Sequence, residues 1–140
     1  MALWAKLKAL LYQRSSPVKP LHLQRGVQGE SAARDHLVAK GLKFLTANYM
    51  GRRGEIDLVF RDADCLVFVE VKTRSSGWTR PERAVNAAKQ RALRRTAQDY
   101  LRQLKAQDIK YRFDIVEVLL QDGEISEIRH LENTFARRTR

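Results

Sequence analysis

Two apolar runs joined by a short acidic turn constrain the fold of this chain more than any other feature of its sequence. In residues 55–61 apolar and polar positions alternate, and the apolar positions facing one way are Ile56, Leu58 and Phe60. Asp57 faces the opposite way. Residues 65–72 follow the turn and carry four apolar side chains on one face, while Glu70 and Lys72 end the other face. The pattern predicts two antiparallel strands of one sheet.

The remaining elements follow from periodicity and from residues that cap or break helices. An amphipathic helix is predicted at residues 27–40 and ends at Gly41, which favours the backbone conformation of a helix C-cap. A second helix is predicted from a capping box at Thr79 and Glu82 to about residue 105. Further strands are predicted at residues 43–48, 111–120 and 124–131. The order α-β-β-β-α-β-β indicates an α/β fold with a mixed central sheet and flanking helices.

One compact domain accounts for most of the 140 residues. We expect a basic amphipathic helix and linker at residues 1–24, the domain at residues 25–136 and a basic tail at residues 137–140. The chain has one cysteine and three scattered histidines, so neither a disulfide framework nor a cysteine-rich zinc site is expected. No apolar run approaches the ~20 residues of a membrane span, and the first residues do not read as a signal peptide. We therefore expect a cytoplasmic protein with no integral membrane association.

The charge of the chain favours a polyanionic partner. There are 27 Lys and Arg residues against 16 Asp and Glu residues, which gives a net charge of +11. Such an excess favours nucleic acid first and an acidic membrane surface second. A merely basic protein without such a partner is the plainer alternative.

Glu70 and Lys72 are charged residues within the most apolar run of the sequence. Burial of an unpaired charge is costly, so they indicate either an ion pair or a functional site. If the loop between the two strands has four residues, Asp57 falls directly opposite Glu70, whereas a three-residue loop places Val69 opposite Asp57. The sequence leaves both registers open. The structural alternative is an ion pair between Glu70 and a nearby cation on a solvent-facing sheet surface.

Two carboxylates that face each other need a cation between them. Oxygen ligands favour a hard divalent ion, so Mg²⁺ or Mn²⁺ is the expected cofactor. Such an ion can hold a phosphodiester oxygen and lower the pKa of a bound water. Lys72 would position that water or stabilise the negative charge that develops on the phosphate. The register that pairs Asp57 with Glu70 therefore predicts phosphodiester hydrolysis.

The stretch GEIDLVFRDADCLVFVEVKTR resembles the core of the YraN family of small bacterial proteins. The same resemblance extends to QGE at residues 28–30, to Lys89, and to RFD at residues 112–114, and it covers residues 25–135. That family is assigned to the PD-(D/E)xK superfamily, which has the restriction-endonuclease-like fold and includes archaeal Holliday-junction resolvases. The resemblance implies that fold and an endonuclease activity for this chain.

The resemblance also implies roles for individual residues. The catalytic and metal-binding set that it implies is Asp57, Glu70, Lys72, the backbone carbonyl of Val71, and Glu30. Asp57 would be the metal-binding aspartate, and Glu70 with Lys72 the E-x-K pair. Glu30 would complete the site from the first helix. The superfamily's nominal proline is replaced by Ile56, a departure at a position of variable role.

Basic side chains around this site would bind the phosphates of a nucleic acid with little preference for sequence. The residues expected to make these contacts are Arg52, Arg53, Arg74, Lys89, Gln90 and Arg94. A solvated basic surface is the alternative for them. Trp78 would stack on an unpaired base or pack on its own domain. Glu55 would either join the site or pair with a loop arginine. Asp114 would either pair with Arg112 or support the site, and the structural role is favoured.

The sequence therefore favours a metal-dependent endonuclease that acts on branched or single-stranded nucleic acid, DNA rather than RNA. A non-cleaving nucleic-acid-binding accessory module in DNA uptake, repair or processing is one alternative. A membrane-surface or protein adaptor that uses the N-terminal helix is another. The expected partners are nucleic acid, a DNA-processing protein and, for symmetric cutting of two strands, a second copy of the chain.

Overall fold

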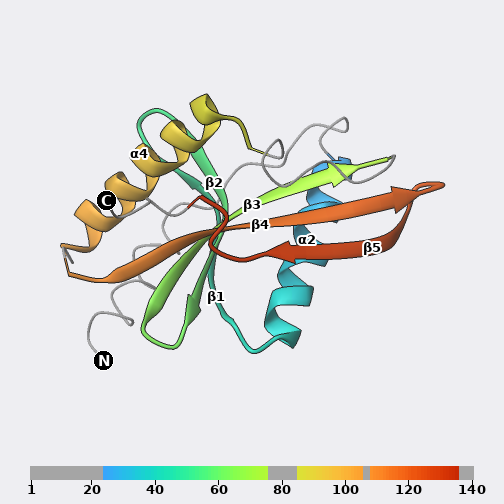
Figure 1. Ribbon diagram of the computed structural model, residues 1–140, viewed down its shortest axis with the longest axis horizontal. Helices are drawn as coiled ribbons and strands as arrows, with labels where there is room; N and C mark the ends of the chain where they lie inside the picture. Colours follow the sequence, from blue (N-terminus) through green and yellow to red (C-terminus); the bar gives the residue numbers. More distant parts are fainter. Residues whose placement is uncertain (1–23, 76–84, 106–107, 136–140) are drawn as a thin grey trace.

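The computed structural model describes residues 24–75, 85–105 and 108–135 (Figure 1). The expected N-terminal helix and linker, Trp78 and the basic tail lie outside the described residues. The domain expected from residue 25 onward begins, in the described part, with a helix at Gln24.

A five-stranded sheet and two helices make up the described part of the chain. In chain order the elements are α2 (Gln24–Ala39), β1 (Lys43–Met50), β2 (Glu55–Asp62), β3 (Cys65–Arg74), α4 (Ala87–Leu104), β4 (Lys110–Gln121) and β5 (Glu124–Leu131). The strands lie in the order β1-β2-β3-β4-β5. The β3–β4 pair is parallel and the other pairs are antiparallel, so the expected α/β fold with a mixed sheet is confirmed. Neither helix in these residues is both long and apolar enough to cross a membrane.

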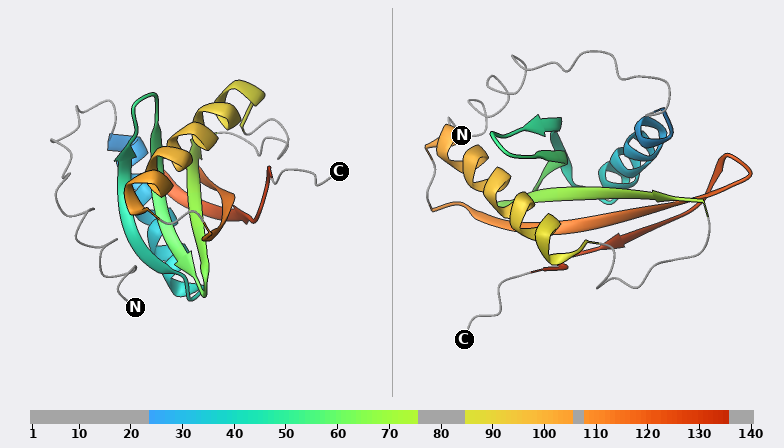
Figure 2. Two further views of the ribbon diagram at one scale, coloured as in Figure 1. Left: turned by 90° about the vertical axis from the view of Figure 1, so that its left-hand side faces the viewer. Right: turned by 90° about the horizontal axis from the view of Figure 1, so that it is seen from above.

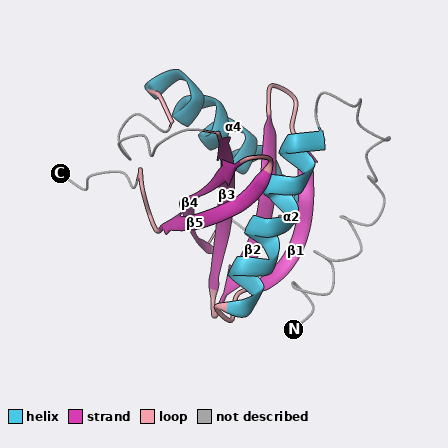
Figure 3. Cartoon of the chain, turned by 90° about the vertical axis from the view of Figure 1, so that its right-hand side faces the viewer, coloured by secondary structure: helices cyan, strands magenta, loops and turns pink. Residues whose placement is uncertain are grey.

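The two helices cover opposite faces of the sheet (Figures 2 and 3). The face under α4, here called the α4 face, carries a cluster that includes Phe68, Phe113 and Tyr100. The face under α2, here called the α2 face, carries a second cluster that includes Leu37 and Val69. Both clusters draw on β3, since Phe68 and Val69 alternate across its pleat. β3 is therefore buried from both sides, and a charge on it is exceptional.

The end of the β1–β2 ribbon departs from the alternation expected from the sequence. Ile56 packs in the α4-face cluster, whereas Leu58 packs in the α2-face cluster. The expectation that Ile56 shares a face with Leu58 and Phe60 is therefore wrong. Asn48 in the neighbouring strand has a φ of 54°, a left-handed conformation that asparagine tolerates. The same reversal appears on β1, because Ala47 packs against the α2 face and Tyr49 against the α4 face.

The helix ends agree with the sequence at α2 and differ from it at α4. Gly41, with φ 98°, donates its N–H to the carbonyl of Val38 and ends α2 as expected. A continuous helix from the capping box to residue 105 is wrong, because residues 85 and 86 are not helical. Asn86 instead caps α4, and its side chain accepts a hydrogen bond from Lys89 N–H at 2.8 Å. This late start places Lys89 in the first turn of α4.

Candidate active site

The register of the central hairpin is the one that brings Asp57 toward Glu70. The paired residues run from Asp62 with Cys65 to Leu58 with Val69. Continued by one residue along both strands, this register places Asp57 opposite Glu70. The protein therefore adopts the form with the four-residue loop. The ladder of paired residues between β2 and β3 stops at Leu58, and the two strands are no longer paired at Asp57.

Asp57 bridges this separation with its side chain. Its Oδ2 accepts a hydrogen bond from the N–H of Val71 at 2.8 Å, in place of a backbone carbonyl of β2. In a strand, the N–H and C=O of one residue point toward the same neighbouring strand. The carbonyl of Val71 is therefore directed to the side on which Asp57 lies. This arrangement suits the pair of metal ligands that the sequence suggests.

Glu70 is buried without full compensation of its charge. It is 4% exposed, and its Oε1 lies 3.5 Å from Lys72 Nζ and 3.6 Å from Lys89 Nζ. Its buried Oε2 has no hydrogen-bond partner. Burial raises the pKa of Glu70 to about 7, the charge of Asp57 and a hydrogen bond to it act in the same direction, and the two lysines oppose them.

The oxygen atoms gathered here fit a hard divalent cation. Glu70 has an unpartnered buried oxygen, and its ionised form is disfavoured by Asp57, so a cation placed between them would relieve both penalties. Among the described residues, no three His, Cys, Asp or Glu side chains are grouped closely enough to hold a metal ion. The donors that the structure brings together are thus two carboxylates and one peptide carbonyl.

Glu30 lies near the end of β3 but is not part of a three-acid group. Its neighbour Gly29 packs so closely on Thr73 that a Cβ at Gly29 would collide with the Thr73 hydroxyl. The start of α2 is therefore held against the end of β3, on the α2 face. Glu30 itself is half-buried. Its expected role in completing the site stays a prediction.

Lys89 was expected to contact phosphate, and the structure gives it an ion pair with Glu70. Lys72 and Lys89 reach the same oxygen from β3 and α4, and both remain partly open to solvent. Two ammonium groups that converge on one acid can also meet an incoming phosphate. The Asn86 cap was a local signal for the start of α4, but the ion pair itself depends on how α4 crosses the sheet.

The loop that carries Arg52 and Arg53 lies farther along α4 than expected. Gly51 packs against Thr96, and the Arg52 N–H donates to Asp99 at 3.2 Å. At 1.5 Å per residue, Thr96 lies about 10 Å along the helix from Lys89. The two exposed arginines thus follow a glycine that packs against α4 about two turns from Lys89.

The other side chains expected to contact phosphate differ in whether they already form hydrogen bonds within the domain. Arg94 donates to the carbonyl of Phe135 at 2.6 Å, and Gln90 donates to the carbonyl of Val85 at 3.0 Å. Both therefore stabilise the domain itself. Arg74 is half-buried at the end of β3, with its Nε buried and without a hydrogen-bond partner. Glu55 is half-buried and pairs with Met50 at the end of the β1–β2 ribbon.

A buried acid that the sequence analysis missed lies beside Lys72 in the sheet. Glu117 on β4 is the ladder neighbour of Lys72, and Arg129 on β5 is the ladder neighbour of Glu117. Glu117 is fully buried and lies 3.0 Å from Arg129, while its Oε1 has no hydrogen-bond partner. Its signal was the same as that of Glu70, namely a charge within an apolar strand.

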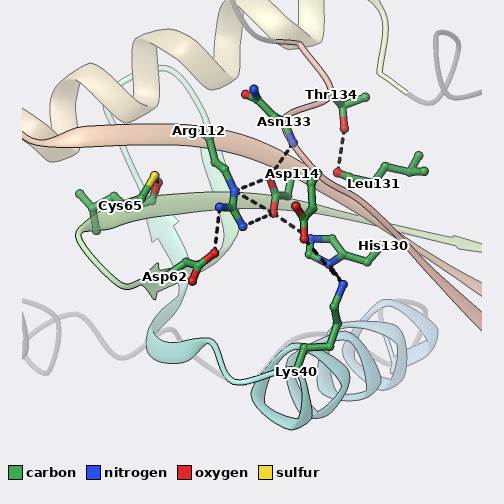
Figure 4. Close-up of polar contacts among 11 residues, drawn as sticks. Lys40, Asp62, Cys65, Arg112, Asp114, His130, Leu131, Asn133 and Thr134 are labelled. Atoms are coloured by element: carbon green, nitrogen blue, oxygen red, sulfur yellow. Dashed lines mark hydrogen bonds and ion pairs between the residues drawn. The ribbon is translucent and has the colours of Figure 1, made fainter.

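The second buried acid of β4, Asp114, lies on the α2 face in a dense polar cluster (Figure 4). Arg112 Nε lies 3.1 Å from Asp114, which confirms the expected pair, and Arg112 also reaches Asp62 at 2.9 Å. The Asn133 N–H donates to Asp114 at 2.9 Å, and His130 Nε2 lies 2.8 Å from it. Burial raises the pKa of Asp114, but the hydrogen bonds from His130, Asn133 and Arg112 outweigh it, so the pKa is lowered.

Comparison with known proteins places the chain in a family. Residues 29–118 match the family described as "Uncharacterised protein family UPF0102". A UPF0102 protein of Acetivibrio thermocellus is 44% identical over 116 residues, which are 79% of this chain and 89% of that protein. One from Alkaliphilus oremlandii is 44% identical over 113 residues, 79% of this chain and 96% of that protein. One from Rhodococcus opacus is 36% identical over 115 residues, 81% of this chain and 98% of that protein. These matches confirm the family resemblance found in the sequence, and the chain belongs to the UPF0102 family.

Proposed function

We propose that this protein is a metal-dependent endonuclease that hydrolyses phosphodiester bonds in nucleic acid. The observation that carries the proposal is Glu70, a buried carboxylate with an unpartnered oxygen, next to Asp57 and two lysines. A purely structural acid at this depth would have its oxygens paired. The net charge of +11 supports a polyanionic substrate.

Asp57, Glu70 and the carbonyl of Val71 would hold Mg²⁺ or Mn²⁺, with Glu30 as a further ligand from α2. When bound, the ion would polarise a phosphodiester oxygen and lower the pKa of a water molecule. Lys72 would orient that water and offset the charge that develops on the phosphate. Lys89, on the opposite wall, would help to attract and position the phosphate. Branched or single-stranded DNA is the substrate class that the sequence resemblance favours.

The proposal is tested by incubating the protein with Mg²⁺ or Mn²⁺ and labelled substrates. The panel contains a duplex, a single strand, a flap, a four-way junction and an RNA. Lys72→Ala should lower the rate by about 100-fold or more, since it removes a charge at the reacting phosphate. Lys110→Ala is the matched control, because Lys110 pairs with Asp64 on the exposed surface. Equal cleavage by wild type and Lys72→Ala would assign the activity to a contaminant.

Glu70→Ala separates binding from chemistry. It should abolish cleavage and metal affinity while nucleic-acid binding, measured in EDTA, stays within about twofold of wild type, because phosphate contacts come from basic groups elsewhere. A Glu70→Ala protein that cuts at the wild-type rate would contradict the site assignment. Binding without cleavage by wild type would show instead a non-cleaving accessory module.

A further inference from the structure

A cavity of about 420 Å³ lies beside α4, apart from the site around Glu70. The lining residues that matter here are Arg94, Arg95, Arg102, Tyr111, Phe113 and Phe135. They come from the middle and the C-terminal part of α4, from the start of β4 and from the segment after β5. The volume is in the range of pockets that bind small organic molecules.

Aromatic rings form one wall of this cavity. Phe113 and Phe135 stack with their centroids 4.7 Å apart, and Tyr111 meets Phe113 edge to face at 5.9 Å. Tyr111 is 41% exposed, although it is a large aromatic residue on a central strand. Gln98 on α4 donates to its hydroxyl at 3.1 Å and so fixes the ring at the mouth of the cavity. An open, held aromatic ring is a surface on which a flat ligand can stack.

Guanidinium groups form the opposite wall. Arg94 is anchored to Phe135 by its hydrogen bond and by a cation–π contact at 5.5 Å. Arg102 is 71% exposed, and Asp99 is 3.8 Å away. Arg95 is exposed, and no acid forms an ion pair with it among the described residues. The cavity thus offers cationic groups beside an apolar aromatic surface.

We propose that this cavity binds an unpaired nucleotide of a nucleic acid strand. The base would stack on Tyr111, and the adjacent phosphates would meet Arg95 and Arg102. A base within a duplex is already stacked on both faces, so the pocket would select single-stranded segments. This inference rests on the proposed function, because it assumes that nucleic acid is the substrate.

The position of the cavity relative to Glu70 supports this reading. Tyr111 is the ladder neighbour of Leu66, and Ile115 is the ladder neighbour of Glu70. Four residues of strand separate the two points by about 13 Å. Tyr111 contacts Phe68, which lies on the same face of β3 as Glu70. A single strand lying along α4 would therefore reach both the cavity and the site.

The test measures fluorescence anisotropy of a labelled 12-nucleotide single strand and of a matched duplex, both in EDTA so that no cleavage occurs. Tyr111→Ala should raise the Kd for the single strand by about 5- to 100-fold and the Kd for the duplex by less than about twofold. Tyr111→Phe keeps the ring and should bind within about twofold of wild type. Arg95→Ala should weaken single-strand binding, with a smaller salt dependence.

Three results would overturn the inference. The first is unchanged single-strand binding by Tyr111→Ala. The second is an equal loss of affinity for the single strand and the duplex in this variant. The third is tight binding of a poly-glutamate peptide that competes with the single strand, which would assign the cavity to an acidic protein. Thermal unfolding of each variant shows whether it is folded. Cleavage by the wild type, together with an unchanged Kd for the single strand in Tyr111→Ala, would overturn only the cavity assignment. A protein that binds single strands through Tyr111 but never cuts overturns only the endonuclease proposal.

Discussion

Asp114 and Glu70 are buried carboxylates on neighbouring strands, one register step apart and on opposite faces of the sheet. Val69 pairs with Asp114 and Glu70 pairs with Ile115. Asp114 accepts hydrogen bonds from Arg112, His130 and Asn133. Glu70 has two lysines at 3.5 and 3.6 Å and one oxygen without a hydrogen-bond partner. At the same depth, one acid is fully paired and the other is not.

The difference distinguishes a structural acid, Asp114, from Glu70, which we propose is functional. Hydrogen bonds hold the pKa of Asp114 below its ordinary value, so this residue is ionised and contributes to folding. Lys40 supports the arrangement, because its ammonium lies 2.6 Å from His130 Nδ1 and can only donate. The His130 proton is therefore on Nε2, which donates to Asp114. Glu70 has no comparable set of hydrogen-bond donors. Its raised pKa is typical of residues at ligand-binding or catalytic sites.

The largest expected effect is on stability. Asp114→Asn should lower the free energy of unfolding by about 3–5 kcal/mol, because it leaves Arg112 without its charge partner and takes the carboxylate acceptor away from His130. Glu70→Gln should instead raise it by on the order of 3 kcal/mol at pH 7, since it removes a buried charge that is poorly compensated. Urea unfolding measures both, and Asp64→Asn is an exposed control. Equal destabilisation by the two variants would remove the distinction between the two acids.

The pH dependence of stability should have opposite signs at the two residues. The pKa of Glu70 is raised from 4.5 to about 7, so the folded protein binds this proton more tightly than the unfolded chain. The free energy of unfolding of the metal-free protein should therefore fall as pH rises from about 4.5 to about 7, by on the order of 3 kcal/mol. Asp114, with a lowered pKa, adds stability above its ordinary value of 3.8 that is lost as the pH falls below it.

Glu70→Gln isolates this dependence. The difference in unfolding free energy between wild type and Glu70→Gln should change across pH 4.5 to 7 and stay flat above that range. Guanidinium unfolding at several pH values measures it, with other titrating groups cancelling in the difference. Parallel profiles for the two proteins would show that folding does not raise the pKa of Glu70 and that its pairing is sufficient.

The smallest effect concerns one cation of Glu70. Lys89→Met should raise the pKa of Glu70 further, because Lys89 lowers it now. The change in stability should stay below about 1 kcal/mol, since the Lys89 side chain is 41% exposed. Carbon-13 NMR titration of the Glu70 carboxyl measures the pKa directly. Arg91→Met on the exposed side of α4 is the control, and an equal shift there would point to a general loss of charge.

Local patterns were sufficient to predict the strands and their order along the chain. Alternation located β2 and β3, and the Asp122-Gly123 turn, where both residues have positive φ, located the last hairpin. Alternation failed at Ile56 because the cause, the left-handed Asn48, lies on a different strand. The helix boundary also failed at α4, because Asn86 caps the helix there.

The candidate site was predictable only in part. Asp57, Glu70 and Lys72 stood out because they are charges within or beside apolar strands. The Lys89 ion pair depends on how α4 crosses the sheet, which no local pattern encodes. Glu117 carried a visible signal, but its neighbours Lys72 and Arg129 come from strands that only the sheet order brings together. The donors of Asp114 likewise arrive from β5 and the segment after it.

The hydrogen bond from Val71 to Asp57 makes one side chain serve two purposes. Asp57 is a candidate metal ligand, and it also joins β2 to β3 where their ladder has ended. If an ion binds this carboxylate, as we propose, it would weaken the hydrogen bond to the amide, and occupancy of the site would then be coupled to the joining of β2 and β3. The exchange rate of the Val71 amide proton with solvent would therefore report ion binding at the site, and its measurement needs no added label.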